Sequence, residues 1–224
     1  MITPGPDEPA VTDWRVQPFD SVAGELLRRL DRRGPGRRVV AVDGRGGGGK
    51  TTMALRLAHR LPEAAVVATD DIAWNESIFG WSHLLVDGVL RSYRAGEAVR
   101  YRPPAWDRGQ RAGAIEVPGT TRVLIIEGVG ASRTELVPWL DAAIWVQSDF
   151  AEAERRGLAR DIASGVNGDA EATIAFWHTW MAEELPFFTR DRPWERSDLI
   201  VAGTSTTSLP DDAIAASAWH DGDS

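Results

Sequence analysis

Apolar residues along the chain gather in five short continuous runs, separated by stretches in which they recur every three or four residues. The runs predict strands at Arg38–Asp43, Ala64–Thr69, Arg122–Glu127, Ala142–Gln147 and Asp198–Ala202. Each run is apolar throughout rather than alternating, which is typical of parallel strands covered on both faces. We therefore expect an α/β fold with a five-stranded parallel sheet flanked by helices.

Helical periodicity fills the stretches between the strands and also precedes the first one. The predicted helices lie at Gly49–Leu61, about Leu84–Ala95, Phe150–Ser164 and Ala170–Leu185. An amphipathic helix is also expected from about Phe19 to Arg33, where the glycines and proline of 34–36 end the pattern. Strands that alternate with helices favour right-handed crossovers between parallel strands.

The two ends of the chain and one internal segment do not follow this alternation. Residues 1–13 are rich in Pro, Asp and Glu, which predicts a disordered or loosely attached arm. Residues 96–121 suggest a long loop or a small hairpin, and an alanine-rich piece at 213–218 suggests a final helix. We divide the chain into an N-terminal arm and helix (1–36), a central domain (37–203) and a C-terminal tail (204–224).

A glycine-rich motif lies between the first predicted strand and the helix after it. The motif G-x-x-x-x-G-K-[ST] and the residue that follows it comprise Gly44, Arg45, Gly46, Gly47, Gly48, Gly49, Lys50, Thr51 and Thr52. The glycines let backbone N–H groups point at phosphates, and the helix adds its positive N-terminal end. Lys50 would neutralise the β- and γ-phosphates, and the Thr51 hydroxyl would bind Mg²⁺. The motif predicts ATP and Mg²⁺ as cofactors.

Composition narrows the remaining classes of function. The net charge of −8 makes a nucleic-acid partner unexpected, and the absence of cysteine excludes disulfides and thiolate metal sites. No apolar stretch approaches the ~18 residues of a membrane span, and the N-terminus lacks the order of a signal peptide. A cytoplasmic protein without a membrane partner is expected, and assembly into a homo-oligomer is left open. Lys50 is the only lysine, which supports the motif that contains it.

Acidic residues at the ends of two predicted strands favour a small-molecule kinase over other nucleotide-binding classes. A GTPase is disfavoured because its Asn-Lys-x-Asp motif needs a second lysine, and one small domain rarely holds an ATPase motor. Asp70 could accept the proton of an attacking hydroxyl, and Asp71 could orient Mg²⁺ through water. Glu127 could reach Mg²⁺ directly or through water. The alternative for Asp70 and Asp71 is a purely structural role in a turn or a helix cap. The alternative for Glu127 is an ordinary acidic residue at the end of a strand, without a metal.

Arginines and aromatic residues supply the other candidates for the site. Arginines four residues apart share a helix face, so we expect Arg156 and Arg160 to stabilise the transferring phosphoryl group. A solvated charged face is the alternative. The candidate substrate-contacting residues are Asp70, Trp74, His83, Arg102 and Trp106. Aromatic rings can stack on a planar acceptor, although core packing is the alternative for each tryptophan.

These elements, in this order, resemble the uridine kinase branch of the P-loop nucleoside kinases over about residues 37–203. The strand and loop VVAVDGRGGGGKTT, the acids that begin Asp70-Asp71-Ile72-Ala73, Glu127-Gly128 and Arg160-Asp161 are similar to the family's ordered motifs. The resemblance implies a five-stranded parallel sheet with a small lid, and Asp70 as the general base. The part of the chain expected to bind the acceptor differs from the family. In the motif that begins with Asp70, Ile72 and Ala73 replace the family's pair of aromatic residues.

We therefore expect ATP- and Mg²⁺-dependent phosphorylation of a hydroxyl on a small-molecule acceptor, with a nucleoside favoured by the resemblance. A kinase for another small alcohol, such as a vitamin precursor, a sugar or a nucleoside antibiotic, is the first alternative. A nucleotide-binding regulatory module with little turnover is the second. Asp70 favours an enzyme, because binding alone needs no base at that strand end.

Overall fold

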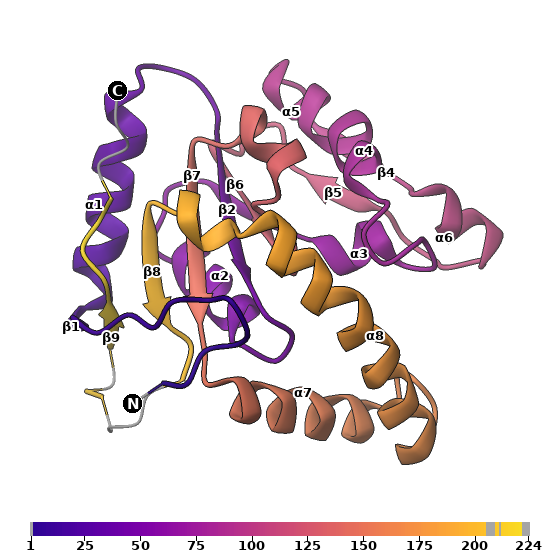
Figure 1. Ribbon diagram of the computed structural model, residues 1–224. Helices are drawn as coiled ribbons and strands as arrows, with labels where there is room; N and C mark the ends of the chain where they lie inside the picture. Colours follow the sequence, from indigo (N-terminus) through magenta and orange to yellow (C-terminus); the bar gives the residue numbers. More distant parts are fainter. Residues whose placement is uncertain (1, 205–208, 211, 221–224) are drawn as a thin grey trace.

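The computed structural model describes residues 2–204, 209–210 and 212–220, and its centre is a seven-stranded sheet (Figure 1). In sheet order the strands are β1 (Arg15–Pro18), β9 (Ala213–Ala216), β8 (Leu199–Ala202), β7 (Ala142–Gln147), β2 (Arg38–Gly44), β6 (Val123–Glu127) and β3 (Ala64–Ala68). The five strands from β8 to β3 are parallel, and β9 pairs antiparallel with both β8 and β1. The five predicted parallel strands are confirmed. The sheet has seven strands rather than five, because β9 and β1 were not predicted.

The two additional strands come from the ends of the chain. Ala213–Ala216 forms β9, so the predicted final helix at 213–218 is wrong. Alanine has the highest helix propensity of any residue, but intrinsic propensity is a weak preference, and strand pairing with β8 and β1 outweighs it here. The first strand, β1, then pairs with β9 from Arg15↔Ala216 to Pro18↔Ala213.

Helices cover both faces of the sheet. They are α1 (Phe19–Arg32), α2 (Lys50–Ala58), α3 (Thr69–Ala73), α4 (Ser82–Leu85), α5 (Arg91–Arg94), α6 (Pro104–Arg108), α7 (Phe150–Ser164) and α8 (Ala170–Asp191). A π-helical turn (Val86–Leu90) joins α4 to α5, and 3₁₀ turns lie at Thr134–Trp139 and Pro193–Arg196. The segment 96–121 contains a small hairpin of β4 (Val99–Tyr101) and β5 (Ile115–Val117), as predicted. In the part of the chain that the structure describes, no helix is long and apolar enough to cross a membrane.

Alternate residues of the central strand β2 build two separate cores. Val40 and Val42 pack with apolar residues of α1 and α2 on one face, and Val39 and Ala41 pack with residues of α3 to α5 on the other. All four side chains are fully buried. This burial on both faces explains why the strand reads as a continuous apolar run.

A hairpin of α7 and α8 extends away from the sheet, at the lower right of Figure 1. The side chains of Asp149 and Asp169 cap the two helices by accepting N–H bonds from Glu152 and Ala172, and Gly165 ends α7 in the left-handed conformation. The helices pack closely, since a Cβ on Gly157 would lie 2.3 Å from the Trp177 ring. This hairpin occupies the position of the predicted lid.

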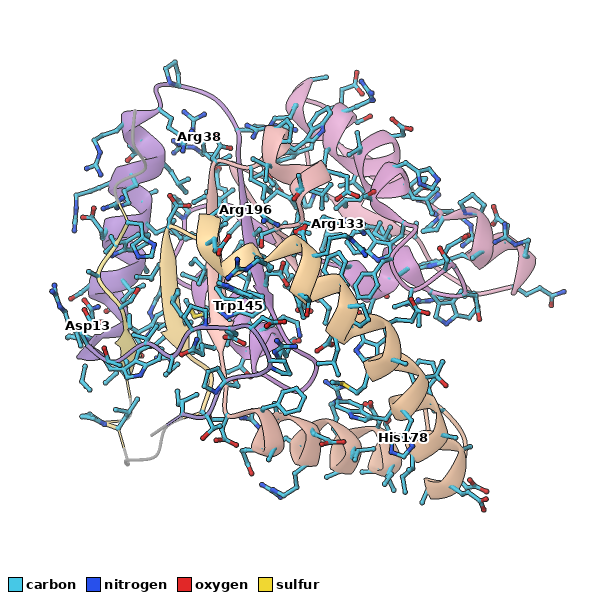
Figure 2. All side chains as sticks on the ribbon, viewed as in Figure 1. Asp13, Arg38, Arg133, Trp145, His178 and Arg196 are labelled. Atoms are coloured by element: carbon cyan, nitrogen blue, oxygen red, sulfur yellow. The ribbon has the colours of Figure 1, made fainter. Side chains whose placement is uncertain are left out.

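The N-terminal segment packs against the sheet, and the prediction of a disordered or loosely attached arm is wrong. Residues 2–11, which we name the strap, run beside Trp145 of β7 (Figure 2). The Thr3 backbone accepts a hydrogen bond from Phe150 N at 2.9 Å, and Val11 N donates to the Gln147 side chain at 3.0 Å. Ile2 is buried. The strap is rich in proline, and its two acidic side chains find specific partners, Asp7 with Thr189 and Glu8 with Arg45.

Candidate active site

The glycine-rich loop connects the end of β2 to the start of α2 in a conformation that only glycine adopts easily. Gly44, Gly47 and Gly49 have φ angles of 154°, 71° and 100°, where a side chain would be strained. A Cβ on Gly47 would lie 2.0 Å from the Ala153 carbonyl oxygen, so α7 touches the loop backbone directly. Lys50 Nζ donates to the Arg45 carbonyl at 2.8 Å, which folds the lysine back over the loop. The backbone of the predicted phosphate loop is therefore tightly curved, and the Lys50 ammonium is hydrogen-bonded to it.

Thr51 and Glu127 bring two oxygen ligands together beside this loop. The Thr51 hydroxyl donates to Glu127 Oε1 at 3.2 Å, and strand pairing places Val42 of β2 opposite Glu127 of β6. Hydroxyl and carboxylate oxygens suit Mg²⁺, which usually takes only one or two protein ligands and completes its shell with phosphates and water. The described residues contain no group of three or more His, Asp or Glu side chains that could hold a metal. The donor set thus fits Mg²⁺ that arrives with a nucleotide.

Asp70, Lys50 and Arg160 lie within electrostatic reach of Glu127. Burial raises the pKa of Glu127 and the charge of Asp70 raises it further, whereas Lys50 and Arg160 oppose the shift. The pKa of Arg160 is raised chiefly by its hydrogen bond to Asp161, with smaller effects from Asp70 and Glu127. The ends of β3 and β6, the start of α2 and one face of α7 thus converge.

Arg156 lies on the same helix as Arg160 but contacts the nucleotide loop from another side. Its Nη1 donates to the Gly203 carbonyl at 3.3 Å, and its Nη2 lies 3.9 Å from the position of a Cβ on Gly49. Arg155 instead pairs with Glu152 on the exposed side of α7. Arg156 therefore borders the loop from α7, whereas Arg160 pairs with its neighbour Asp161. Their role in phosphoryl transfer stays a prediction.

Glu127→Gln tests the buried carboxylate through the pH dependence of stability. The raised pKa means that ionisation of Glu127 costs folding energy, a cost absent below the pKa of an unfolded glutamate and growing as pH rises through the folded pKa. In thermal melts without nucleotide or metal, we expect the glutamine variant to be more stable than wild type at pH 8 and equal to it near pH 4. Its Mg²⁺-dependent activity should fall roughly 10²-fold. A variant less stable at pH 8 would contradict the assignment.

The predicted acceptor residues near Asp70 form an interlocked cluster. The Asp71 carboxylate pairs with Arg111, and its backbone carbonyl accepts the Trp106 indole N–H at 2.8 Å. The Arg111 guanidinium lies 3.8 Å from the centre of the Trp106 ring and 5.5 Å from that of Trp74. Trp106 is buried, whereas Trp74 is half-buried. Arg111 engages Oδ1 of Asp71, and the predicted role of Asp71 in orienting Mg²⁺ through water stays a prediction.

The other two candidates for substrate contact lie apart from this cluster's centre. Arg102 donates to Asp107 Oδ1 at 2.9 Å and to the Arg111 carbonyl at 3.0 Å, so it braces its own loop. His83 is exposed on α4. Their contacts with an acceptor stay predictions, while Arg111, which the sequence pattern did not single out, occupies the central position.

Two buried acids that the sequence analysis did not select hold the loop in place. Asp43 accepts hydrogen bonds from Gly44 N, Gly130 N and both the backbone and hydroxyl of Ser132, at 2.7 to 2.9 Å. Its position directly before the motif was visible in the sequence, but its partners were not. Glu184 of α8 accepts from Gly46 N at 3.2 Å and from Trp180 Nε1 at 2.6 Å. Burial raises the pKa of both carboxyls.

The parallel sheet, the phosphate loop after its central strand and the α7–α8 hairpin together form a P-loop fold, and the solved structures similar to it include kinases. No family model and no curated protein matches the chain. A Silicibacter sp. TM1040 structure, provisionally named a fructose transport system kinase, has 25% identity and a TM-score of 0.57 over 88% of this chain and 98% of that one.

Two further solved structures are similar. A Bacillus stearothermophilus protein named a possible uridine kinase has 20% identity and a TM-score of 0.47, covering 79% of this chain and 98% of its own. The protein named YGR205w has 10% identity and a TM-score of 0.54, covering 83% and 93%. The predicted α/β fold class is confirmed.

Proposed function

We propose that the protein transfers the γ-phosphoryl group of ATP, with Mg²⁺, to a hydroxyl of a small-molecule acceptor. The observation that carries this proposal is the position of Asp70 at the end of β3, within electrostatic reach of Glu127 and Arg160. A protein that only binds nucleotide needs no carboxylate at this point. A kinase does, because the attacking hydroxyl must lose its proton.

The proposed reaction assigns one role to each residue around the loop. The acceptor oxygen forms a bond to the γ-phosphorus as the bond to the β–γ bridging oxygen breaks, the hydroxyl proton passes to Asp70, and ADP leaves. Lys50 and the loop amides bind the phosphates, and Thr51 with Glu127 would hold Mg²⁺, which neutralises phosphate charge. Arg156 and Arg160 stabilise charge on the phosphoryl group during transfer.

A nucleoside is the leading acceptor, in keeping with the motifs that resemble uridine kinases. A sugar or another small alcohol is the second candidate, favoured by the name of the Silicibacter structure, the most similar of the three in sequence and in fold.

The test is ADP release from Mg·ATP across a panel of nucleosides, sugars and vitamin precursors, with the mass of each product confirmed. Phosphorylated product from any member supports the proposed kinase, and the preferred member identifies the acceptor class. ATP binding with no acceptor-dependent ADP release across the panel would instead favour a nucleotide-binding regulatory module.

A further inference from the structure

The side chain of Arg45 points away from the interior of the phosphate loop and into a buried cluster of acids. Its Nε donates to Glu8 Oε2 at 3.2 Å, and its Nη1 lies 3.8 Å from Glu184 Oε1. The three side chains are at most 5% exposed. A guanidinium buried between two carboxylates is held firmly, because moving any one member leaves an unpaired buried charge.

The backbone of the same arginine shapes the phosphate loop. The Arg45 carbonyl accepts Lys50 Nζ at 2.8 Å and Gly48 N at 3.0 Å. The lysine and the amide that bear on the phosphates therefore depend on where this peptide group lies. A single residue thus connects the buried acids to the loop that would bind nucleotide.

Glu8 belongs to the strap, and among its described contacts the ion pair with Arg45 is the one that leads to the phosphate loop. Its second oxygen accepts hydrogen bonds from Trp145 Nε1 at 2.6 Å and Gln147 Nε2 at 2.9 Å, so the carboxylate is fixed at the end of β7. The strap backbone adds another contact, since the Pro6 carbonyl accepts from Arg45 Nη2 at 3.1 Å. A Cβ on Gly5 would lie 2.2 Å from Arg45 Nε, which shows how closely the strap covers the guanidinium.

We propose that the strap is part of the nucleotide site: Glu8 is a positioning residue that acts through Arg45 on the phosphate loop, so strap docking and nucleotide binding strengthen each other. The inference rests on the proposed function, because it needs a nucleotide on the loop. Coupling between two sites is reciprocal, so a strap that increases nucleotide affinity must itself be held more tightly when nucleotide is bound.

The first experiment measures Mg·ADP affinity by titration calorimetry for wild type and Glu8→Gln. Glutamine keeps an oxygen for Trp145 and Gln147 but turns an amide N–H toward Arg45 Nε, which selectively breaks the connection. We expect the Kd for Mg·ADP to rise roughly 10-fold, within the usual range of coupling between sites. In kinetics, KM for ATP should rise while kcat at saturating ATP changes less than 2-fold, on the order of a weak structural effect.

Two further variants separate coupling from general damage to the strap. Gly5→Ala displaces the Arg45 guanidinium without changing any charge, so it should also weaken Mg·ADP binding. If Glu8→Gln does not fold, the Mg·ADP affinity of Gly5→Ala tests the coupling instead. Asp7→Asn is the matched control, because Asp7 is exposed and its carboxylate accepts only the Thr189 hydroxyl among the contacts described. Its Kd should equal that of wild type.

Hydrogen exchange of residues 2–11 tests the reciprocal effect, which is whether bound nucleotide stabilises the docked strap. In wild type, Mg·ADP should slow exchange in the strap, where Thr3 N and Val11 N donate to Asp149 and Gln147. Unchanged Mg·ADP affinity in both Glu8→Gln and Gly5→Ala would overturn the coupling while leaving the proposed function intact. Wild-type protein that does not bind Mg·ADP at all would overturn both.

Discussion

Replacing Asp70 by asparagine is expected to lower turnover at least ~10²-fold while leaving Mg·ATP affinity nearly unchanged. The asparagine amide has the same size but cannot accept the acceptor's proton. Asp70 is exposed in the first turn of α3, so the substitution should not disturb the core. Pre-steady-state ADP formation and calorimetric ATP binding measure the two effects separately.

Asp71→Asn provides the matched comparison, because it makes the same chemical change one residue later. Since Asp71 pairs with Arg111, its loss should loosen the cluster around Trp74 and Trp106 and act mainly on KM for the acceptor. Full activity of Asp70→Asn together with an inactive Asp71→Asn would exchange the proposed roles of the two acids.

Lys50→Ala should have the second large effect, on binding and catalysis together. The lysine is buried beside Glu127, and without it neither the phosphate charge nor the glutamate would have a compact cation nearby. We expect kcat/KM for ATP to fall at least ~10²-fold, with weaker Mg·ADP binding by calorimetry.

Lys50→Arg separates charge from shape at the same position. Arginine keeps the positive charge, but its planar guanidinium is larger than an ammonium and does not fit the same space between the loop and the phosphates. We expect this variant to be almost as impaired as the alanine variant. Unaltered ATP binding in both would remove the phosphate-loop assignment.

Features encoded by contiguous residues could be predicted from the sequence. The strand, glycine-rich loop and helix from Arg38 to Ala58 follow one another directly, and β7 has the same bounds in prediction and structure. In each case the pattern that identifies the element lies within the element. Asp70 and Glu127 could be selected for the same reason, because each lies at the end of an apolar run.

Partners that are distant in sequence could not be predicted in this way. Glu8 and Glu184 meet at Arg45, yet glutamate is common and nothing around either residue distinguishes it. The segment 96–121 offers several arginines, and only the three-dimensional contacts single out Arg111 as the one beside Trp74. Side-chain pairing between separate elements is a property of tertiary packing.

The predictions for the strap and for residues 213–218 are wrong because both segments depend on contacts with residues far away in the sequence. Composition suggested disorder for the strap and a helix for the alanine-rich piece, and both inferences considered only local preference. The buried acid pocket around Arg45 and the free edge of β8 decide the outcome instead. Local preferences of about 1 kcal/mol or less per residue are easily outweighed by such long-range contacts.

The edge of the sheet has a consequence for how the chain is made. In the described sheet β1 pairs only with β9. During synthesis β1 therefore has no partner strand until β9, which is made much later, has been added. At typical rates of synthesis the interval is roughly 10–40 s. Throughout that interval β1 has no partner strand, and during the first part of it Glu8 has no completed β7 to hold it. The nascent phosphate loop can therefore form before the strap that braces it is docked, and the edge of the sheet is complete only after β9 has been synthesised.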